Sequence, residues 1–214
     1  MSAVLESLDT LIGRCPVVPV LTLDDPAEAV ALARALAEGG LDVLEVTLRT
    51  GRALEAIRAI AAEVPAVDVG AGTVLEPWQM EAAAEAGARF LVSPGATGRL
   101  LDAAETSPVP WLPAAASASE VMRLRERGHR LLKFFPAESV GGTAALKALA
   151  PVLSDMRFCP TGGIDAAKAP AYLALPNVVA VGGSWVAPAD ALARGDFGRI
   201  TELARAAAAL RTSG

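Results

Sequence analysis

A single pattern recurs along the chain: a short apolar strand-like run, then a turn, then an alanine-rich helical stretch. Such alternation predicts an α/β fold of parallel β/α units. Eight units in 214 residues favour a (β/α)8 TIM barrel over an open doubly wound sheet. We expect one domain over residues 1–214, with an N-terminal helical segment at 1–15. The expected strands are Val17–Leu21, Val43–Leu48, Val67–Ala71, Phe90–Ser93, Trp111–Ala114, Leu131–Phe135, Arg157–Pro160 and Val178–Val181.

Several helix starts carry local signals. Asp25 precedes Pro26, which suits an N-cap followed by a proline at the first helical position. Ser117 and Glu120 have the spacing of a capping box. These signals place the expected helices directly after the expected strands, so the polar strand ends lie close to helix starts.

Composition and charge exclude several classes of protein. Hydrophobic residues make up 53% and charged residues 20%, which excludes intrinsic disorder. The net charge is −5 and no basic run occurs, which argues against a nucleic-acid partner. No apolar stretch of about 18 residues is present, and Met1–Thr10 lacks the pattern of a signal peptide, so we expect no membrane segment.

The scarcity of cysteine and histidine limits the chemistry further. Cys15 and Cys159 cannot form a disulfide framework, and this count fits a cytoplasmic location. His129 is the single histidine, which excludes histidine-rich zinc sites. We expect His129 to be solvated and Cys159 to be a small core residue. These counts leave a carboxylate-bound Mg²⁺ open.

The stretch 43–50 directs charged side chains into the expected barrel. Alternation along the strand places Glu45, Thr47 and Arg49 on one face, which points inward. Charges in a core are costly unless they are paired or used. One interpretation is a structural Glu45–Arg49 ion pair. The interpretation that we favour is a carboxylate base beside an arginine that binds an anion.

Lys133 stands out among the lysines of this chain. Lys147 and Lys168 fall in alanine-rich helical segments, whereas Lys133 lies inside an apolar strand. Burial disfavours an ammonium ion, and a neutral amine can attack a carbonyl to form a Schiff base. The alternative is a structural lysine whose stem packs while its head pairs with Glu45.

The last two expected strands end in paired glycines. Gly162 and Gly163 follow the seventh strand, and Gly182 and Gly183 precede Ser184 at the end of the eighth. In β/α barrels, a phosphate site commonly forms here from backbone N–H groups and a helix N-terminus. Two ordinary glycine turns are the alternative. We predict that Gly162, Gly163 and Ser184 bind phosphate.

The turn at 70–75 resembles part of a dinucleotide-binding GxGxxG motif. Its third glycine is replaced by Leu75, which argues against that function. We interpret the turn as one that lets the backbone approach a ligand and presents the hydroxyl of Thr73.

Together these residues suit a phosphorylated small molecule that ends in a 2-keto acid. Arg49 and Thr73 would hold its carboxylate, and Lys133 would attack the C2 carbonyl. The imine would act as an electron sink for cleavage of the C3–C4 bond. Glu45 would move the protons, and Phe135 would shield the imine from water.

Six motifs in this order resemble the bacterial 2-keto-3-deoxy-6-phosphogluconate (KDPG) aldolases of the Entner–Doudoroff pathway. The resemblance extends from about Pro16 to the C-terminal helix. The motifs are EVTLRT (45–50), GAGTV (70–74), SPG (93–95), KFFPAE (133–138), PTGGI (160–164) and GGSW (182–185).

The resemblance implies a class I aldolase of carbohydrate metabolism that uses no metal and no cofactor, is usually a homotrimer, and releases pyruvate and glyceraldehyde 3-phosphate. It also implies activity on 4-hydroxy-2-oxoglutarate (KHG). It places the Schiff base on Lys133, the general acid/base on Glu45, carboxylate binding on Arg49 and Thr73, phosphate binding on Gly162, Gly163 and Ser184, and the pocket lining on Pro94, Phe135 and Thr161.

One segment departs from the family pattern. After the fifth expected strand the family usually has Pro-Gly and a hydroxyl-rich turn, whereas this chain has Ala114, Ala115 and Ala116. The Cβ of Ala114 and the missing hydroxyl at Ala116 bear on substrate affinity and on stereochemical preference at C4.

Two other classes of function remain open from the residues. One is a different phosphate-binding TIM-barrel enzyme, such as an isomerase, an epimerase or a protein similar to thiamine phosphate synthase. The other is a non-catalytic protein that binds a phosphorylated ligand. The inward placement of both Lys133 and Glu45 favours the aldolase.

Overall fold

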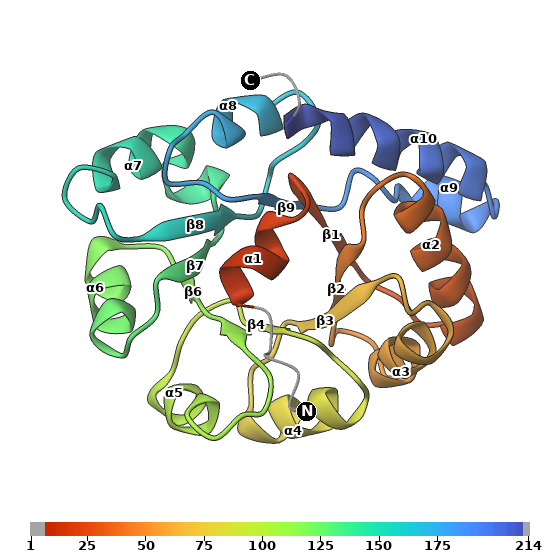
Figure 1. Ribbon diagram of the computed structural model, residues 1–214, viewed down its shortest axis with the longest axis horizontal. Helices are drawn as coiled ribbons and strands as arrows, with labels where there is room; N and C mark the ends of the chain where they lie inside the picture. The colour runs from red at the N-terminus through yellow and green to blue at the C-terminus, as the bar shows by residue number, and fades with distance from the viewer. Residues whose placement is uncertain (1–6, 212–214) are drawn as a thin grey trace.

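The computed structural model describes residues 7–211, and its strands are all parallel. Two hydrogen-bonded sheets are present in this part of the chain, with strand orders β5-β4-β3-β2-β1-β9 and β6-β7-β8. The fold is therefore α/β with a curled parallel sheet (Figure 1). The strands are β1 Val17–Leu21, β2 Val43–Thr47, β3 Asp68–Gly72, β4 Leu91–Val92, β5 Trp111–Leu112, β6 Ala114–Ala115, β7 Leu131–Phe134, β8 Arg157–Pro160 and β9 Val181–Gly183.

Helices follow the strands and surround them on the outside (Figure 1). Because helices cover the outer faces, the strands are buried along nearly their whole length, as is usual for parallel sheets. The helices are α1 Leu8–Gly13, α2 Pro26–Glu38, α3 Ala53–Glu63, α4 Pro77–Glu85, α5 Gly98–Ala104, α6 Ala118–Glu126, η1 Glu138–Val140, α7 Gly142–Leu149, α8 Ala169–Leu173, α9 Ala189–Ala193, α10 Phe197–Ala208 and η2 Ala209–Arg211.

The predicted helix caps are present. The Asp25 carboxylate accepts a hydrogen bond from the backbone N–H of Ala27 at 2.9 Å, and Pro26 opens α2. At α6 the Ser117 hydroxyl accepts from the N–H of Glu120, whose side chain in turn accepts from the N–H of Ala116 at 2.8 Å. These caps fix the entry of each helix immediately beyond a strand end.

Six of the eight expected strands differ in their bounds, and two of them differ by more than one residue at an end. The expected strand at 111–114 is split at Pro113 into β5 and β6. Proline has no backbone N–H to donate to a neighbouring strand. The expected strand at 178–181 begins instead at Val181. Val178 forms an isolated parallel bridge with Phe158 of β8, whereas Val181 pairs with Val17 of β1. The segment thus changes its neighbour partway along.

The helix α1 lies over the amino ends of the strands. Asp9 forms an ion pair with Arg157, the first residue of β8, at 3.5 Å. Arg14 pairs at 2.6 Å with Asp68, the first residue of β3. Residues 1–6 of the predicted N-terminal helical segment lie outside the described residues. Within the described residues, no helix is both long and apolar enough to span a bilayer.

Candidate active site

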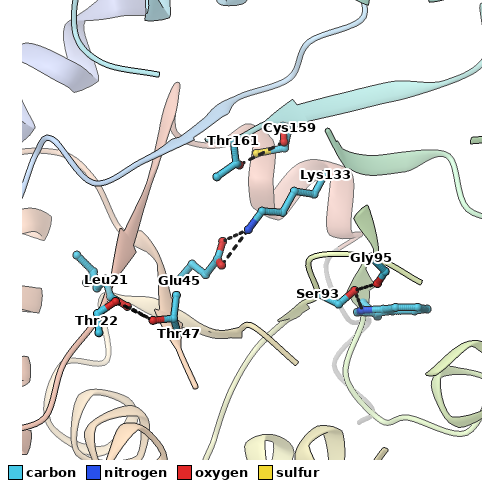
Figure 2. Close-up of polar contacts among 10 residues, drawn as sticks. Leu21, Thr22, Glu45, Thr47, Ser93, Gly95, Lys133, Cys159 and Thr161 are labelled. Atoms are coloured by element: carbon cyan, nitrogen blue, oxygen red, sulfur yellow. Dashed lines mark hydrogen bonds and ion pairs between the residues drawn. The ribbon is translucent and has the colours of Figure 1, made fainter. Parts of the chain in front are cut away.

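A buried lysine and a buried glutamate contact each other on the inner side of the curled sheet. Lys133 of β7 and Glu45 of β2 are only 6% and 3% exposed. The Lys133 amine donates to both carboxylate oxygens of Glu45, at 3.1 Å and 3.2 Å. Figure 2 shows the two side chains pointing toward each other. The inward placement predicted from strand alternation brings them into contact, which is also the contact expected of a purely structural pair.

The neighbours of the lysine on the adjacent strands are small. In the parallel ladders, Lys133 is in register with Ala114 on one side and with Cys159 on the other. Its nitrogen lies 5.5 Å from the centre of the Phe135 ring. Burial raises the pKa of the Cys159 thiol to about 12, so this sulfur stays protonated and is a poor nucleophile. The amine is therefore the nucleophile that this part of the interior offers.

A glycine makes room for the glutamate. A Cβ added at Gly72, the last residue of β3, would lie 2.1 Å from Glu45 Oε1 and 2.6 Å from its Cγ. The close neighbour of Gly72 is thus the Glu45 side chain, and the approach of the 70–73 turn to a ligand stays a prediction. Sequence reasoning missed this role, since it depends on a side chain from the neighbouring strand.

The predicted carboxylate-binding residues follow neighbouring strands. Thr47 of β2 is in register with Gly72 of β3, so Arg49 and Thr73 emerge at the same edge of the sheet. The Arg49 side chain is exposed, and Thr73 has a positive φ of 60°. Glu45 is paired with Lys133, so the described residues do not bear out the alternative of a structural Glu45–Arg49 pair.

The two glycine turns also come together. Gly162 and Gly163 have φ values of 106° and 76°, a region that favours glycine. Thr161 forms a parallel bridge with Gly182, whose absent Cβ would lie 2.2 Å from Thr161 Oγ1. The turn after β8 therefore packs directly on the end of β9, where Ser184 is exposed.

A cavity of about 370 Å³ lies beside Ser184. Its lining comes from the end of β1, the residues that follow β1 and β9, and α9, and it includes Thr22, Leu23 and Trp185. The exposed hydroxyl of Ser184 and the turn at 162–163 thus lie at the carboxyl ends of the strands. In β/α proteins this is the edge at which ligands bind.

The predicted pocket-lining residues differ in exposure. Pro94 is exposed, Phe135 is half-buried and Thr161 is buried. The turn that carries Pro94 is braced by Ser93, whose hydroxyl donates to the carbonyl of Gly95 at 2.6 Å and accepts from Trp111 Nε1 at 3.0 Å (Figure 2).

The expectation for His129 was wrong, whereas Cys159 is a core residue as expected. His129 is half-buried, because its ring packs edge-on against Trp111 with centroids 5.5 Å apart. Burial lowers the pKa of His129. Within residues 7–211, no cluster of three or more histidine, cysteine or acidic residues that could hold a metal is present.

A buried amine that touches a carboxylate inside a curled parallel sheet fits the class of lysine-dependent (class I) aldolases. Comparison with known proteins identifies the family within this class. The chain belongs to the KDPG and KHG aldolase family, whose model matches residues 8–203.

Individual relatives agree with this assignment. The chain is 52% identical over 201 residues to the KHG/KDPG aldolase of Escherichia coli K12, covering 94% of both chains. It superposes with a TM-score of 0.92 on the KDPG aldolase of Legionella pneumophila, which holds pyruvate as a covalent carbinolamine; identity is 42%, covering 95% of this chain and 98% of that one. The Zymomonas mobilis KDPG aldolase gives 0.90 at 48% identity, covering 96% and 98%.

Proposed function

We propose that this protein is a class I aldolase that cleaves KDPG to pyruvate and glyceraldehyde 3-phosphate, and that it also cleaves 4-hydroxy-2-oxoglutarate. The observation that carries the proposal is the buried contact between Lys133 Nζ and the Glu45 carboxylate at 3.1 Å. The names of relatives that match over nearly the whole chain support both substrates.

Carbon–carbon cleavage begins at the 2-keto acid end of the substrate. Arg49 and Thr73 hold its carboxylate, which places the C2 carbonyl over Lys133. The Lys133 amine loses a proton to Glu45 and attacks C2. Glu45 returns that proton to the carbinolamine hydroxyl, which leaves as water and gives a protonated imine. Glu45 then takes the proton of the C4 hydroxyl as the C3–C4 bond breaks, and the bonding electrons move into the imine to give an enamine.

The remaining steps release the two products and return the proton held by Glu45. Glyceraldehyde 3-phosphate leaves first, since cleavage has turned C4 into an aldehyde. Glu45 returns its proton to C3 of the enamine, and water hydrolyses the resulting imine to free pyruvate and Lys133. The Phe135 ring beside the amine limits the access of water until that step.

Gly162, Gly163 and Ser184 hold the phosphate at the other end of the substrate. Both glycines have positive φ, which aligns backbone N–H groups in a concave turn of the kind that binds anions. The Ser184 hydroxyl adds a donor from the neighbouring strand end. Pro94 and Thr161 line the wall between the two ends.

We further propose that the curled sheet closes as a (β/α)8 barrel, in which β5 and β6 form one strand interrupted at Pro113. The bridge between Thr161 and Gly182 supports contact between β8 and β9. We propose that the barrel is a single domain that assembles as a homotrimer in the cytoplasm. Cys15 and Cys159 are both free and buried, in line with a reducing compartment.

Trapping of the imine tests the proposal. Borohydride with pyruvate should add the mass of one reduced pyruvate, located by peptide mapping at Lys133. The Lys133→Met variant should show neither the adduct nor cleavage of KDPG, whereas Lys147→Met on the exposed face of α7 should behave as wild type. Full turnover in Lys133→Met, or activity lost on EDTA treatment without an adduct, would instead favour a metal-assisted barrel enzyme.

A further inference from the structure

A polar cluster outside the lysine–glutamate pair surrounds the expected phosphate turn. Glu138 begins η1, five residues after Lys133, and its carboxylate accepts a hydrogen bond from the hydroxyl of Tyr172 on α8. The other carboxylate oxygen pairs with Lys168 Nζ at 2.8 Å. We call Glu138, Lys168 and Tyr172 the turn clamp.

The turn clamp is attached to the glycines themselves. Lys168 Nζ donates to the carbonyl of Gly163 at 2.9 Å. A Cβ at Gly163 would lie 2.8 Å from Cγ of Glu138, so the turn packs against the Glu138 stem. The backbone N–H of Glu138 also donates to the carbonyl of Gly162 at 3.1 Å. Both glycines are therefore held by Glu138 and its partners.

The charges of the turn clamp support each other near neutral pH. Hydrogen bonds from Lys168 and Tyr172 lower the pKa of Glu138, and the bond to Glu138 raises the pKa of Lys168. Burial and the neighbouring Glu138 raise the pKa of Tyr172, so its phenol stays protonated and remains a donor. The clamp thus keeps a carboxylate, an ammonium and a neutral hydroxyl together.

We propose that Glu138, Lys168 and Tyr172 are positioning residues that hold the 162–163 turn in its phosphate-binding shape and thereby set the preference for phosphorylated over unphosphorylated substrates. This inference rests on the proposed function. Lys168 Nζ is already bound to Glu138 and to the Gly163 carbonyl, so its contribution is to the turn and not a free charge for the substrate.

The two substrates of the proposed function separate this role from general stability. KDPG carries the phosphate and 4-hydroxy-2-oxoglutarate does not. In Glu138→Gln and Tyr172→Phe, the KM for KDPG should rise about tenfold, the equivalent of one hydrogen bond to a charged group. The KM and kcat for 4-hydroxy-2-oxoglutarate should stay within about twofold of wild type, since chemistry at Lys133 is not touched.

Direct binding of phosphate needs no turnover. Calorimetry with inorganic phosphate on the native enzyme, the two variants and the surface control Lys147→Met should show weaker binding only in the clamp variants. This measurement remains valid if Lys133 fails to form an imine, so failure of the aldolase proposal and failure of the clamp are distinguishable.

Three results would overturn the clamp. Equal changes in KM for both substrates would indicate a general structural role. A lower Tm with an unchanged ratio of the KM values for KDPG and 4-hydroxy-2-oxoglutarate would also indicate a general structural role. Tighter phosphate binding in Glu138→Gln would show that Lys168, once released from Glu138, binds the phosphate directly.

Discussion

Substitution of Gly72 by alanine probes how the Glu45 carboxylate, the proposed acid/base, is placed. The backbone φ of Gly72 lies outside the left-handed region, so the effect of the new side chain is steric alone. The added Cβ would meet Glu45 Oε1 at 2.1 Å and its Cδ at 2.7 Å. To restore ordinary contact distance, the carboxylate has to withdraw by about 1 Å.

A shift of this size acts on rate more than on folding. A misplacement of about 1 Å can lower kcat about 100-fold, or about 2.7 kcal/mol of transition-state stabilisation. Overpacking of the core should lower the free energy of unfolding by about 2 kcal/mol, roughly 4–8 °C in Tm for a chain of this size. The assays are steady-state KDPG cleavage and thermal unfolding of the same preparation.

Gly98→Ala is the matched control. Gly98 opens α5, and an added Cβ there has no atom within 4 Å. We expect wild-type kcat and an equal or slightly higher Tm, because alanine favours a helix. A Gly72→Ala enzyme with wild-type kcat would refute the view that this glycine makes room for the Glu45 carboxylate.

Three further predictions follow from burial. Glu45→Leu should lower the free energy of unfolding, measured by urea titration, by about 3–5 kcal/mol. The double variant that also carries Lys133→Met should recover most of this loss, and no recovery would contradict a buried charge pair. The pKa of His129 is lowered, so stability relative to His129→Gln should fall as pH drops through about 6.5; a constant difference would argue against burial. Burial raises the pKa of Cys15 to about 11 and of Cys159 to about 12, so iodoacetamide at about pH 8 should label both only in urea; rapid labelling of the native protein would contradict this.

The alternation of strands and helices could be predicted because each unit carries its own local signal. β1 and β8 have the predicted bounds. β9 does not, because Val178 pairs with β8 while Val181 pairs with β1. That change of neighbour is a property of the assembled sheet, and no local pattern of apolar residues encodes it.

The same distinction applies to the candidate site. The contact between Lys133 and Glu45 could be predicted from strand parity. Both side chains point inward, and a buried charge is costly unless it is paired with an opposite charge. The turn clamp could not, because Glu138 and Tyr172 lie in helices outside the expected strands, so strand parity does not relate their side chains. His129 was misjudged because its neighbour Trp111 belongs to β5, and this contact forms only in the folded chain.

The buried pair makes better sense as chemistry than as a source of stability. Removing two charges from water offsets most of their attraction, and apolar residues of similar volume often stabilise a core as well or better. Lys133 already has the small apolar neighbour Ala114 in register, so an apolar side chain would suit this position. What an apolar replacement could not supply is a proton acceptor 3.1 Å from the amine, the group that must lose a proton before it attacks a carbonyl.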